Sequence, residues 1–257
     1  MTAWLRFEQA GRTGFGVLEA ETVHVYDGDL FLGCAPTGER LPLAELTLTL
    51  PCVPSKLIGL WNNYRALAAK QGSAIPAEPL YFIKAPNSYL AHNRELRAPR
   101  SYTGRVVYEG ELGVVIGRRA YEVDPMQAEA CIFGYTCVND VTALDLISGE
   151  PAFAQWTRAK SFDGFGAFGP VICTGLDAGA LHVRTLVNGR ERQNYPTSDM
   201  IFSPAQIVSQ LSRELTLEPG DLITCGTSLG VGVLKPGTTV EVVIDGVGVL
   251  RNVFVAS

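Results

Sequence analysis

The chain has 257 residues, and its 21 Lys and Arg against 26 Asp and Glu give a formal net charge of −5 at pH 7. The lack of a basic surplus excludes the electrostatic footprint of a nucleic-acid-binding protein. No stretch approaches the roughly 18 consecutive apolar residues of a transmembrane helix, which excludes a membrane span. The 27 Gly and 15 Pro favour many short strands and turns over an all-helical bundle.

The cysteines contain no C-x-x-C pair, and the initial run MTAWLRFEQAG has neither the basic nor the apolar region of a secretory signal. We therefore expect reduced, mostly buried cysteines in a cytoplasmic protein. The six are Cys34, Cys52, Cys131, Cys137, Cys173 and Cys225.

Residues 3–27 alternate in short bursts broken by Gly and Asp, a pattern typical of an antiparallel meander. The stretch 33–46 is expected to be loop. A new strand-like segment begins at LIGLW, so we place a boundary near Cys52 and predict a small N-terminal β-domain (1–52) and a larger domain (53–257).

The second region contains many strand-like runs and few helical ones, which predicts a mixed, mostly β (α+β) fold. Helices are expected over 63–71, around 126–130, and from Ser203 onward. At the last position Ser203 can cap, Pro204 suits the first turn, and Gln206 completes a capping box. The expected apolar face of this helix is Ile207, Val208, Leu211 and Leu215.

Two glutamates interrupt the apolar run VVYEGELGVVIG, residues 106–117. In a strand, residues i and i+2 share a face and lie about 6.6 to 6.8 Å apart, so Glu109 and Glu111 are expected to point the same way. One interpretation is the solvated face of an edge strand. The other is a divalent cation such as Mg²⁺ bridging both carboxylates.

A third carboxylate, Asp140, follows at the end of the buried run CIFGYTCVND. A strand end facing a loop is a common position for functional residues, although a turn or a helix N-cap explains Asp140 equally well. Asp145, five residues further on, is expected to lie on a surface helix.

Lys160 lies among aromatic and small residues in WTRAKSFDGFGAFGP. Three carboxylates and one Mg²⁺ carry a net charge of −1, so an anionic substrate would need a nearby cation such as Lys160. A lysine placed there could bind a carboxylate or move a proton. The competing interpretation is an ordinary exposed lysine.

The Gly-rich loop CGTSLGVG, residues 225–232, lacks the ending of a phosphate-binding loop, but Thr227 could donate a hydrogen bond to a ligand. The histidines have no metal-ligand spacing, and we expect structural or exposed roles for them. They are His24, His92 and His182.

These pieces resemble the fumarylacetoacetate hydrolase superfamily, in order and through nearly the whole chain. The matching runs include VVYEGELGVVIGR, GYTCVNDVTALD, TRAKSFDGFGAFGP and LTLEPGDLITCGTSLGVG. Residues 1–50 resemble the small β-domain of many bacterial members, among them isomerases and acylpyruvase-like enzymes. The resemblance implies a rolled β-sheet, a homodimer, and a site for Mg²⁺ or Mn²⁺.

Position by position, the resemblance implies metal ligands at Glu109, Glu111 and Asp140, an active-site lysine at Lys160, and a substrate-facing Thr227. In the run LWNNYRALAAK it implies substrate contacts from Asn63, Tyr64 and Arg65. Family chemistry acts on small 2-oxo or 1,3-diketo acids, where the metal stabilises an enolate during hydrolysis, decarboxylation or isomerisation.

The chain departs from the hydrolytic pattern at four positions. Leu67 and Lys70 stand where hydrolytic members have a water-activating His and Glu, and Leu144 and Ile147 replace an Arg and a Gln. We therefore favour isomerisation or decarboxylation of a 2-oxo acid, with C–C bond hydrolysis as the alternative. A catalytically weak binding or structural relative is a second alternative.

Overall fold

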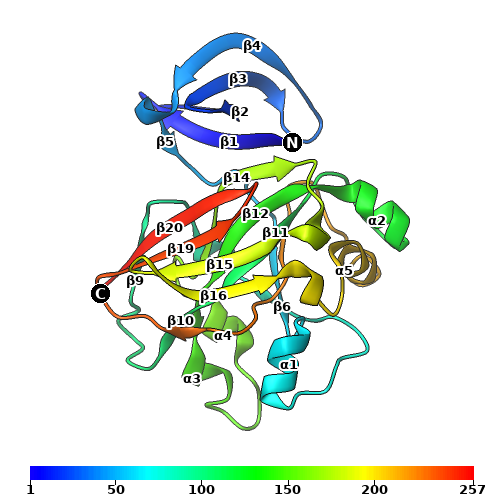
Figure 1. Cartoon of the computed structure of the whole chain (residues 1–257), viewed down its shortest axis with the longest axis vertical. Coiled ribbons are helices and arrows are strands. Elements are labelled where there is room, and N and C mark those ends of the chain that lie inside the picture. The colour runs from blue at the N-terminus through cyan, green and yellow to red at the C-terminus, as the bar shows by residue number, and fades with distance from the viewer.

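The computed structural model describes residues 1–257, and strands predominate in it, as the sequence predicts. Figure 1 shows the N-terminal strands as a layer at one end of the molecule, while the rest forms a larger body. No helix is long and apolar enough to span a membrane.

The N-terminal layer is an antiparallel meander. The hairpin between the first two strands turns at Ala10 and Gly11, both with positive φ, as expected where the turn must match the twist of the strands. The elements are β1 (Thr2–Gln9), β2 (Arg12–Glu19), β3 (Thr22–Asp29), β4 (Gly33–Pro42), the 3-10 turn η1 (Leu43–Glu45) and β5 (Thr47–Leu48).

The expectation of a loop over residues 33–46 is wrong. Most of this stretch is the strand β4, which pairs with β3 and ends the sheet. β4 buries neither face, so it lacks hydrophobic alternation, and its Pro36 is tolerated because the strand lies at an edge. A strand of this kind leaves no periodic signal in the sequence.

The meander is joined to the larger body through β1, which pairs over three residues with β14. The shared sheet runs in the order β4-β3-β2-β1-β14-β12-β11-β17-β6-β7, with β5 paired to β1 and β8 to β14. Its remaining strands are β6 (Leu57–Trp61), β7 (Leu80–Lys84), β8 (Tyr89–Leu90), β11 (Gly110–Ile116), β12 (Ile132–Asp140), β14 (Gly166–Thr174) and β17 (Leu222–Thr224).

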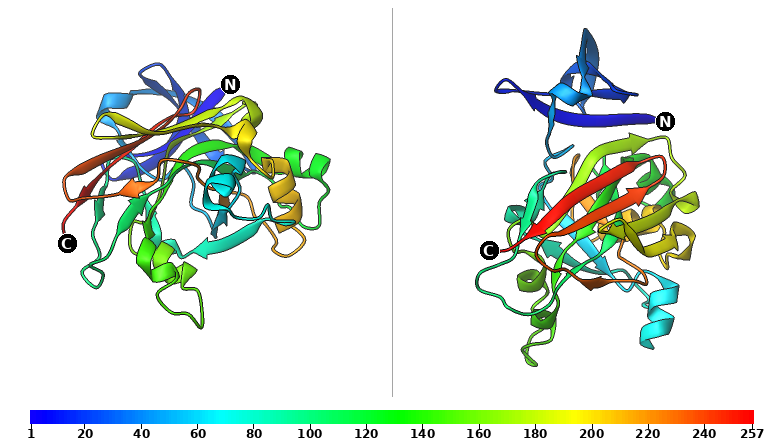
Figure 2. Two further views of the ribbon diagram at one scale, coloured as in Figure 1. Left: turned by 60° about the horizontal axis from the view of Figure 1, so that its bottom comes forward. Right: turned by 60° about the vertical axis from the view of Figure 1, so that its left-hand side comes forward.

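A five-stranded sheet, ordered β16-β15-β19-β20-β9, packs against β11, β12 and β14 (Figures 1 and 2). Alternate residues of β19 are buried between the two sheets. A small third sheet, β13-β10-β18, lies beside them. These strands are β9 (Glu95–Arg97), β10 (Val106–Tyr108), β13 (Thr142–Ala143), β15 (His182–Val187), β16 (Arg190–Pro196), β18 (Gly232–Val233), β19 (Thr238–Ile244) and β20 (Gly248–Val255).

Short helices lie at the edges of the sheets, and the predicted capping box of the last one is confirmed. The Ser203 hydroxyl accepts from the Gln206 amide, and the Gln206 side chain accepts from the Ser203 amide. The helices are α1 (Arg65–Gln71), α2 (Pro125–Cys131), α3 (Leu144–Ile147), α4 (Trp156–Lys160) and α5 (Pro204–Leu211), and further 3-10 turns are η2 (Pro86–Ser88), η3 (Ala178–Ala180) and η4 (Thr197–Asp199).

Candidate active site

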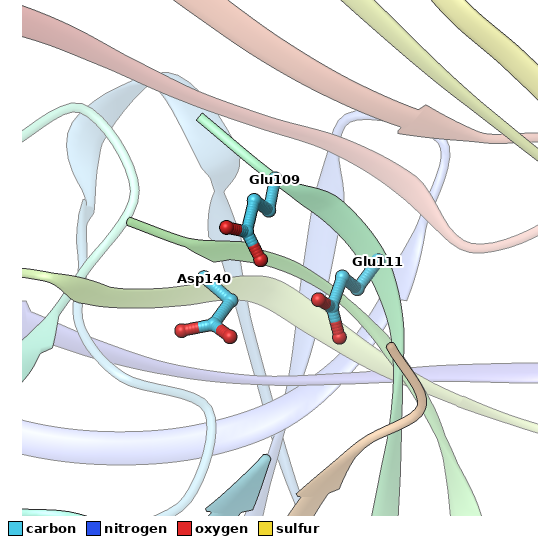
Figure 3. A group of neighbouring side chains, drawn as sticks. All are labelled: Glu109, Glu111 and Asp140. Atoms are coloured by element: carbon cyan, nitrogen blue, oxygen red, sulfur yellow. The ribbon is translucent and has the colours of Figure 1, made fainter. Parts of the chain in front are cut away.

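Three carboxylates converge where β10, β11 and β12 meet (Figure 3). Glu109 links β10 to β11, Glu111 lies in β11, and Asp140 ends β12. Oxygen atoms of the three lie within 4.8 Å of one another. The backbone fixes this convergence, because the Asp140 amide donates to the Glu109 carbonyl at 2.8 Å and the Glu109 amide donates to the Asn139 side chain at 3.1 Å.

Glu111 is fully buried, yet only one of its carboxylate oxygens has partners. Oε2 accepts from the Gly226 amide at 2.7 Å and from the Thr224 hydroxyl. Oε1 has no hydrogen-bond partner within the chain. Burial, together with the charges of Asp140 and Glu109, holds the pKa of Glu111 well above its ordinary value. An ionised carboxylate in this position is therefore unfavourable unless a cation binds beside it.

Lys160, the last residue of α4, lies against two of the three acids. Its Nζ donates to Asp140 Oδ2 at 2.6 Å and to Glu109 Oε2 at 2.9 Å, and its side chain is 3% exposed. Burial alone would lower the pKa of Lys160, but the nearby acids outweigh this effect and raise it. Lys160 is therefore a protonated ammonium group in the metal-free protein.

A second lysine, Lys84 at the end of β7, is completely buried beside the cluster. Its Nζ donates to Asp140 Oδ1 at 2.5 Å and to the Val141 carbonyl at 3.2 Å. Burial would raise the pKa of Asp140, but Lys160 and Lys84 together lower it below its ordinary value. Burial lowers the pKa of Lys84 in spite of the Asp140 charge. Two lysines thus face three acids.

A cavity of about 410 Å³ opens on one side of this cluster. Glu109, Lys160 and Thr227 line it directly, whereas Glu111 and Asp140 lie buried behind the wall. The Thr227 hydroxyl donates to the Gly110 carbonyl at 3.1 Å and accepts from the Gln193 side chain at 2.8 Å. These bonds hold Thr227 against Gly110, the residue between the two glutamates.

The rest of the cavity wall is mostly apolar, and aromatic rings form one part of it. Phe82 stacks on Trp156 with ring centroids 5.5 Å apart and an interplanar angle of 14°, and Trp61 lies 5.9 Å from Trp156. The Lys160 ammonium lies 4.8 Å from the centre of the Phe82 ring. Leu67, Lys70, Leu144 and Ile147 also line this cavity.

The three residues of the run at 63–65 do not join this group. Asn63 is buried, and its side chain bonds to the Phe202 backbone and to the Cys225 carbonyl. Tyr64 packs in the core against Tyr195, and Arg65 is exposed at the start of α1. Their neighbour Asn62, which was not predicted, lines the cavity instead, because a positive φ at this residue turns the chain.

The remaining histidine and acid predictions fall outside the cavity. His92 lies in a loop, where its Nδ1 accepts from the Arg251 amide at 3.1 Å. Asp145 lies on α3 and pairs with Arg105, as expected for a surface helix residue. All six cysteines are free, and all but Cys34 are buried.

Sequence reasoning did not identify Lys84 or the aromatic wall. Lys84 closes the otherwise apolar run PLYFIK, and a charged residue in such a run is the signal that could have found it. Trp61, Phe82 and Trp156 come from three separate segments, and nothing in their spacing predicts that they meet.

Comparison with known proteins places the chain among its relatives. The model of the fumarylacetoacetate (FAA) hydrolase C-terminal family matches residues 56–255, and an Rv2993c-like N-terminal model matches residues 3–51. The oxaloacetate tautomerase YisK of Bacillus subtilis is 38% identical over 224 residues, covering 82% of this chain and 73% of YisK.

A bifunctional isomerase/decarboxylase of 4-hydroxyphenylacetate degradation from Salmonella dublin is 39% identical over 199 residues, covering 76% of this chain and 46% of that longer protein. The crystal structure of 2-hydroxyhepta-2,4-diene-1,7-dioate isomerase from Mycobacterium marinum superposes with a TM-score of 0.91 at 36% identity, covering 100% of this chain and 99% of that one. The chain belongs to the fumarylacetoacetate hydrolase family and has its mostly β fold.

Proposed function

We propose that this chain is a divalent-metal-dependent enzyme that acts on a small 2-oxo acid through its enolate, in isomerisation or decarboxylation rather than hydrolysis. In isomerisation the enolate forms when a C–H bond beside the keto group breaks, and in decarboxylation it forms when the C–C bond to the departing CO₂ breaks. In both reactions a proton is then returned to carbon or oxygen. The observation that carries the proposal is the buried ammonium of Lys160 beside the three acids, at the wall of an otherwise largely apolar cavity.

The chain's own residues fit a bound Mg²⁺ or Mn²⁺. Glu109, Glu111 and Asp140 offer only oxygen donors, which hard cations prefer, and Glu111 Oε1 lacks any partner within the protein. When all three acids are ionised, Lys84 and Lys160 leave a net charge of −1 at the cluster. When bound, such an ion supplies Lewis-acid polarisation of a carbonyl group.

Lys160 has two roles in this proposal. Its ammonium group binds the anionic substrate, and Nζ delivers its proton to the substrate carbon beside the keto group as the enolate returns to the keto form. Thr227 orients the substrate from the opposite loop, and the apolar wall excludes water, which strengthens the electrostatic interactions inside the cavity.

The composition of the cavity wall argues against efficient hydrolysis. Hydrolysis requires a base that activates water, and neither Leu67 nor the positively charged Lys70 is suited to that role. No histidine lines the cavity, and Glu109, the only carboxylate that lines it, is already bonded to Lys160 and Thr142. His92 and Arg65 both lie elsewhere.

The test compares three reactions with one preparation of the protein. After chelation, we expect tautomerisation or decarboxylation of oxaloacetate to depend on added Mg²⁺ or Mn²⁺, and acylpyruvate cleavage to be slower. Loss of general-base activation costs typically about 10² to 10⁴-fold in rate. Cleavage of an acylpyruvate with an ordinary kcat of about 1 to 10³ per second would contradict the proposal.

The homodimer that the resemblance implies stays a prediction. Light scattering of the purified chain, whose monomer mass is 27.7 kDa, checks it directly. We expect a mass close to twice that of the monomer.

A further inference from the structure

The aromatic part of the cavity wall lies directly beside Lys160, the proposed proton donor. Trp156 and Lys160 are four residues apart on α4, so they lie on the same face of the helix, one turn apart. Phe82 contacts both, since its ring is under the Lys160 ammonium and stacks on the Trp156 indole. A substrate held at Lys160 therefore has an aromatic surface beside it, continued by Trp61.

Aliphatic side chains from two other helices complete this apolar region. Leu67 comes from α1, and Leu144 and Ile147 come from α3. Together with Trp61 and Trp156, the two α3 residues also line a second hollow of about 540 Å³ that faces the solvent. The apolar region thus extends from the neighbourhood of Lys160 towards the protein surface.

The charges nearby do not favour a second carboxylate on the substrate. Arg105 in the outer hollow is already paired, because its Nε and its backbone amide donate to Asp145 at 2.8 and 2.7 Å. This bonding to Arg105 lowers the pKa of Asp145 to about 2. The remaining cation in the inner wall is Lys70, whose side chain is exposed on α1.

We infer, resting on the proposed function, that the preferred substrate is a 2-oxo monocarboxylic acid with an aromatic or bulky apolar tail, which packs on Phe82, Trp156 and Trp61. A second carboxylate packed against these rings would lose its hydration in an apolar environment, which is costly. Aromatic tails gain both apolar burial and offset or edge contacts with the rings.

The experiment uses the metal-loaded wild-type protein with two probes, the enol–keto tautomerisation of phenylpyruvate and that of oxaloacetate. We expect kcat/KM for phenylpyruvate to be higher by about tenfold or more, in line with what apolar pockets discriminate. Trp156→Ala should lower kcat/KM for phenylpyruvate by about 10 to 100-fold and change that for oxaloacetate by less than about threefold. Phe153→Ala is the control, because Phe153 is 70% exposed and does not line the cavity.

A second variant tests the same inference without removing a ring. Leu144→Arg adds a cation beside the apolar region and should shift the preference towards oxaloacetate. Three outcomes would overturn the inference of an aromatic tail and leave the proposed function standing. The first is a wild-type preference for oxaloacetate, and the second is an equal loss of kcat/KM for both probes in Trp156→Ala. The third is a loss of kcat/KM confined to oxaloacetate in Lys70→Met. Failure to turn over either probe with Mg²⁺ or Mn²⁺ would refute the proposed function as well.

Discussion

The N-terminal meander and the strands β11 and β12 bury side chains of different kinds. In the meander the buried side chains are apolar, such as Leu5, Phe7, Val23 and Val25, and no charged residue is buried. In β11 all seven residues are buried, and Glu111 is among them, while β12 ends in the buried Asp140.

This difference separates the parts of the chain that serve stability from those that serve chemistry. Buried charges cost free energy unless they are paired, and a pair is often no more stabilising than apolar residues of the same volume. Lys84 and Lys160 are brought from β7 and α4 to balance the acids, and one oxygen of Glu111 still lacks a partner. The acid cluster therefore makes sense as a functional site with shifted pKa values.

The largest effect is expected from removing an acid of the cluster. Glu109→Gln should weaken Mg²⁺ or Mn²⁺ binding by more than about 100-fold and abolish activity, because losing a ligand should exceed the 10 to 100-fold typical of losing a ligand's own partner. Calorimetry measures the binding. Leu5→Ala in the meander is the control, which should cost about 2 to 5 kcal/mol of stability and leave kcat unchanged. Metal binding by Glu109→Gln at wild-type strength would place the metal site elsewhere.

The next largest effect is expected from Lys160→Met, which should lower kcat by about 10² to 10⁴-fold. Metal binding should persist, because the three acids remain and a competing cation has gone. We expect the metal-free variant to melt at a lower temperature than the wild type, since Asp140 and Glu109 lose their partner. Added Mg²⁺ should restore most of that difference. A variant that stays unfolded in saturating Mg²⁺ would instead identify Lys160 as a structural residue.

The raised pKa of Glu111 leads to a smaller, pH-dependent effect. In the metal-free fold the neutral acid is favoured, so Glu111 contributes stability below its unfolded pKa and loses it as pH rises through the folded value. A divalent ion needs the ionised form and must displace the proton. Mg²⁺ affinity should therefore rise with pH up to the raised pKa of Glu111, by at most about tenfold per pH unit for one proton.

Calorimetry in buffers of different ionisation enthalpy counts the protons released on Mg²⁺ binding. A release that falls to zero at high pH supports this assignment. An affinity that does not change with pH anywhere above the ordinary glutamate pKa of about 4.3 would contradict it.

The sequence predicted those features that depend on local geometry. The Ser203–Gln206 capping box and the shared direction of Glu109 and Glu111 follow from short spacings, whereas the family resemblance supplied Asp140 as the third acid. Lys84 was missed, because its contact with Asp140 joins residues 56 positions apart. Strand β4 was missed because the local signal is absent: a strand with two exposed faces has no hydrophobic period to detect.

Asn63 and Tyr64 illustrate a further limit of sequence reasoning. The family resemblance placed them as substrate contacts, but the structure uses their side chains inside the core. A motif identifies which residues lie near a site in the chain, whereas the direction of each side chain depends on the local backbone. Here the positive φ of Asn62 and the extended Tyr64 determine that direction.

The smallest effect is expected from removing an ion pair in the meander. This pair, like those of the acid cluster, joins a cation to a carboxylate, but it lies at an exposed position. Arg12 on β2 contacts Glu39 on β4 at 3.2 Å, and the two side chains are 62% and 38% exposed. Exposed pairs contribute about 0.2 to 1 kcal/mol, because water screens the charges and the long side chains lose freedom. Glu39→Gln should therefore shift the urea midpoint only slightly and leave kcat, KM and metal binding unchanged. Asp140→Asn, by contrast, leaves Lys84 buried without its carboxylate partner, and should cost about 3 to 5 kcal/mol in the metal-free protein. Equal losses of stability in the two variants would show that burial does not distinguish the acid cluster from an ordinary surface pair.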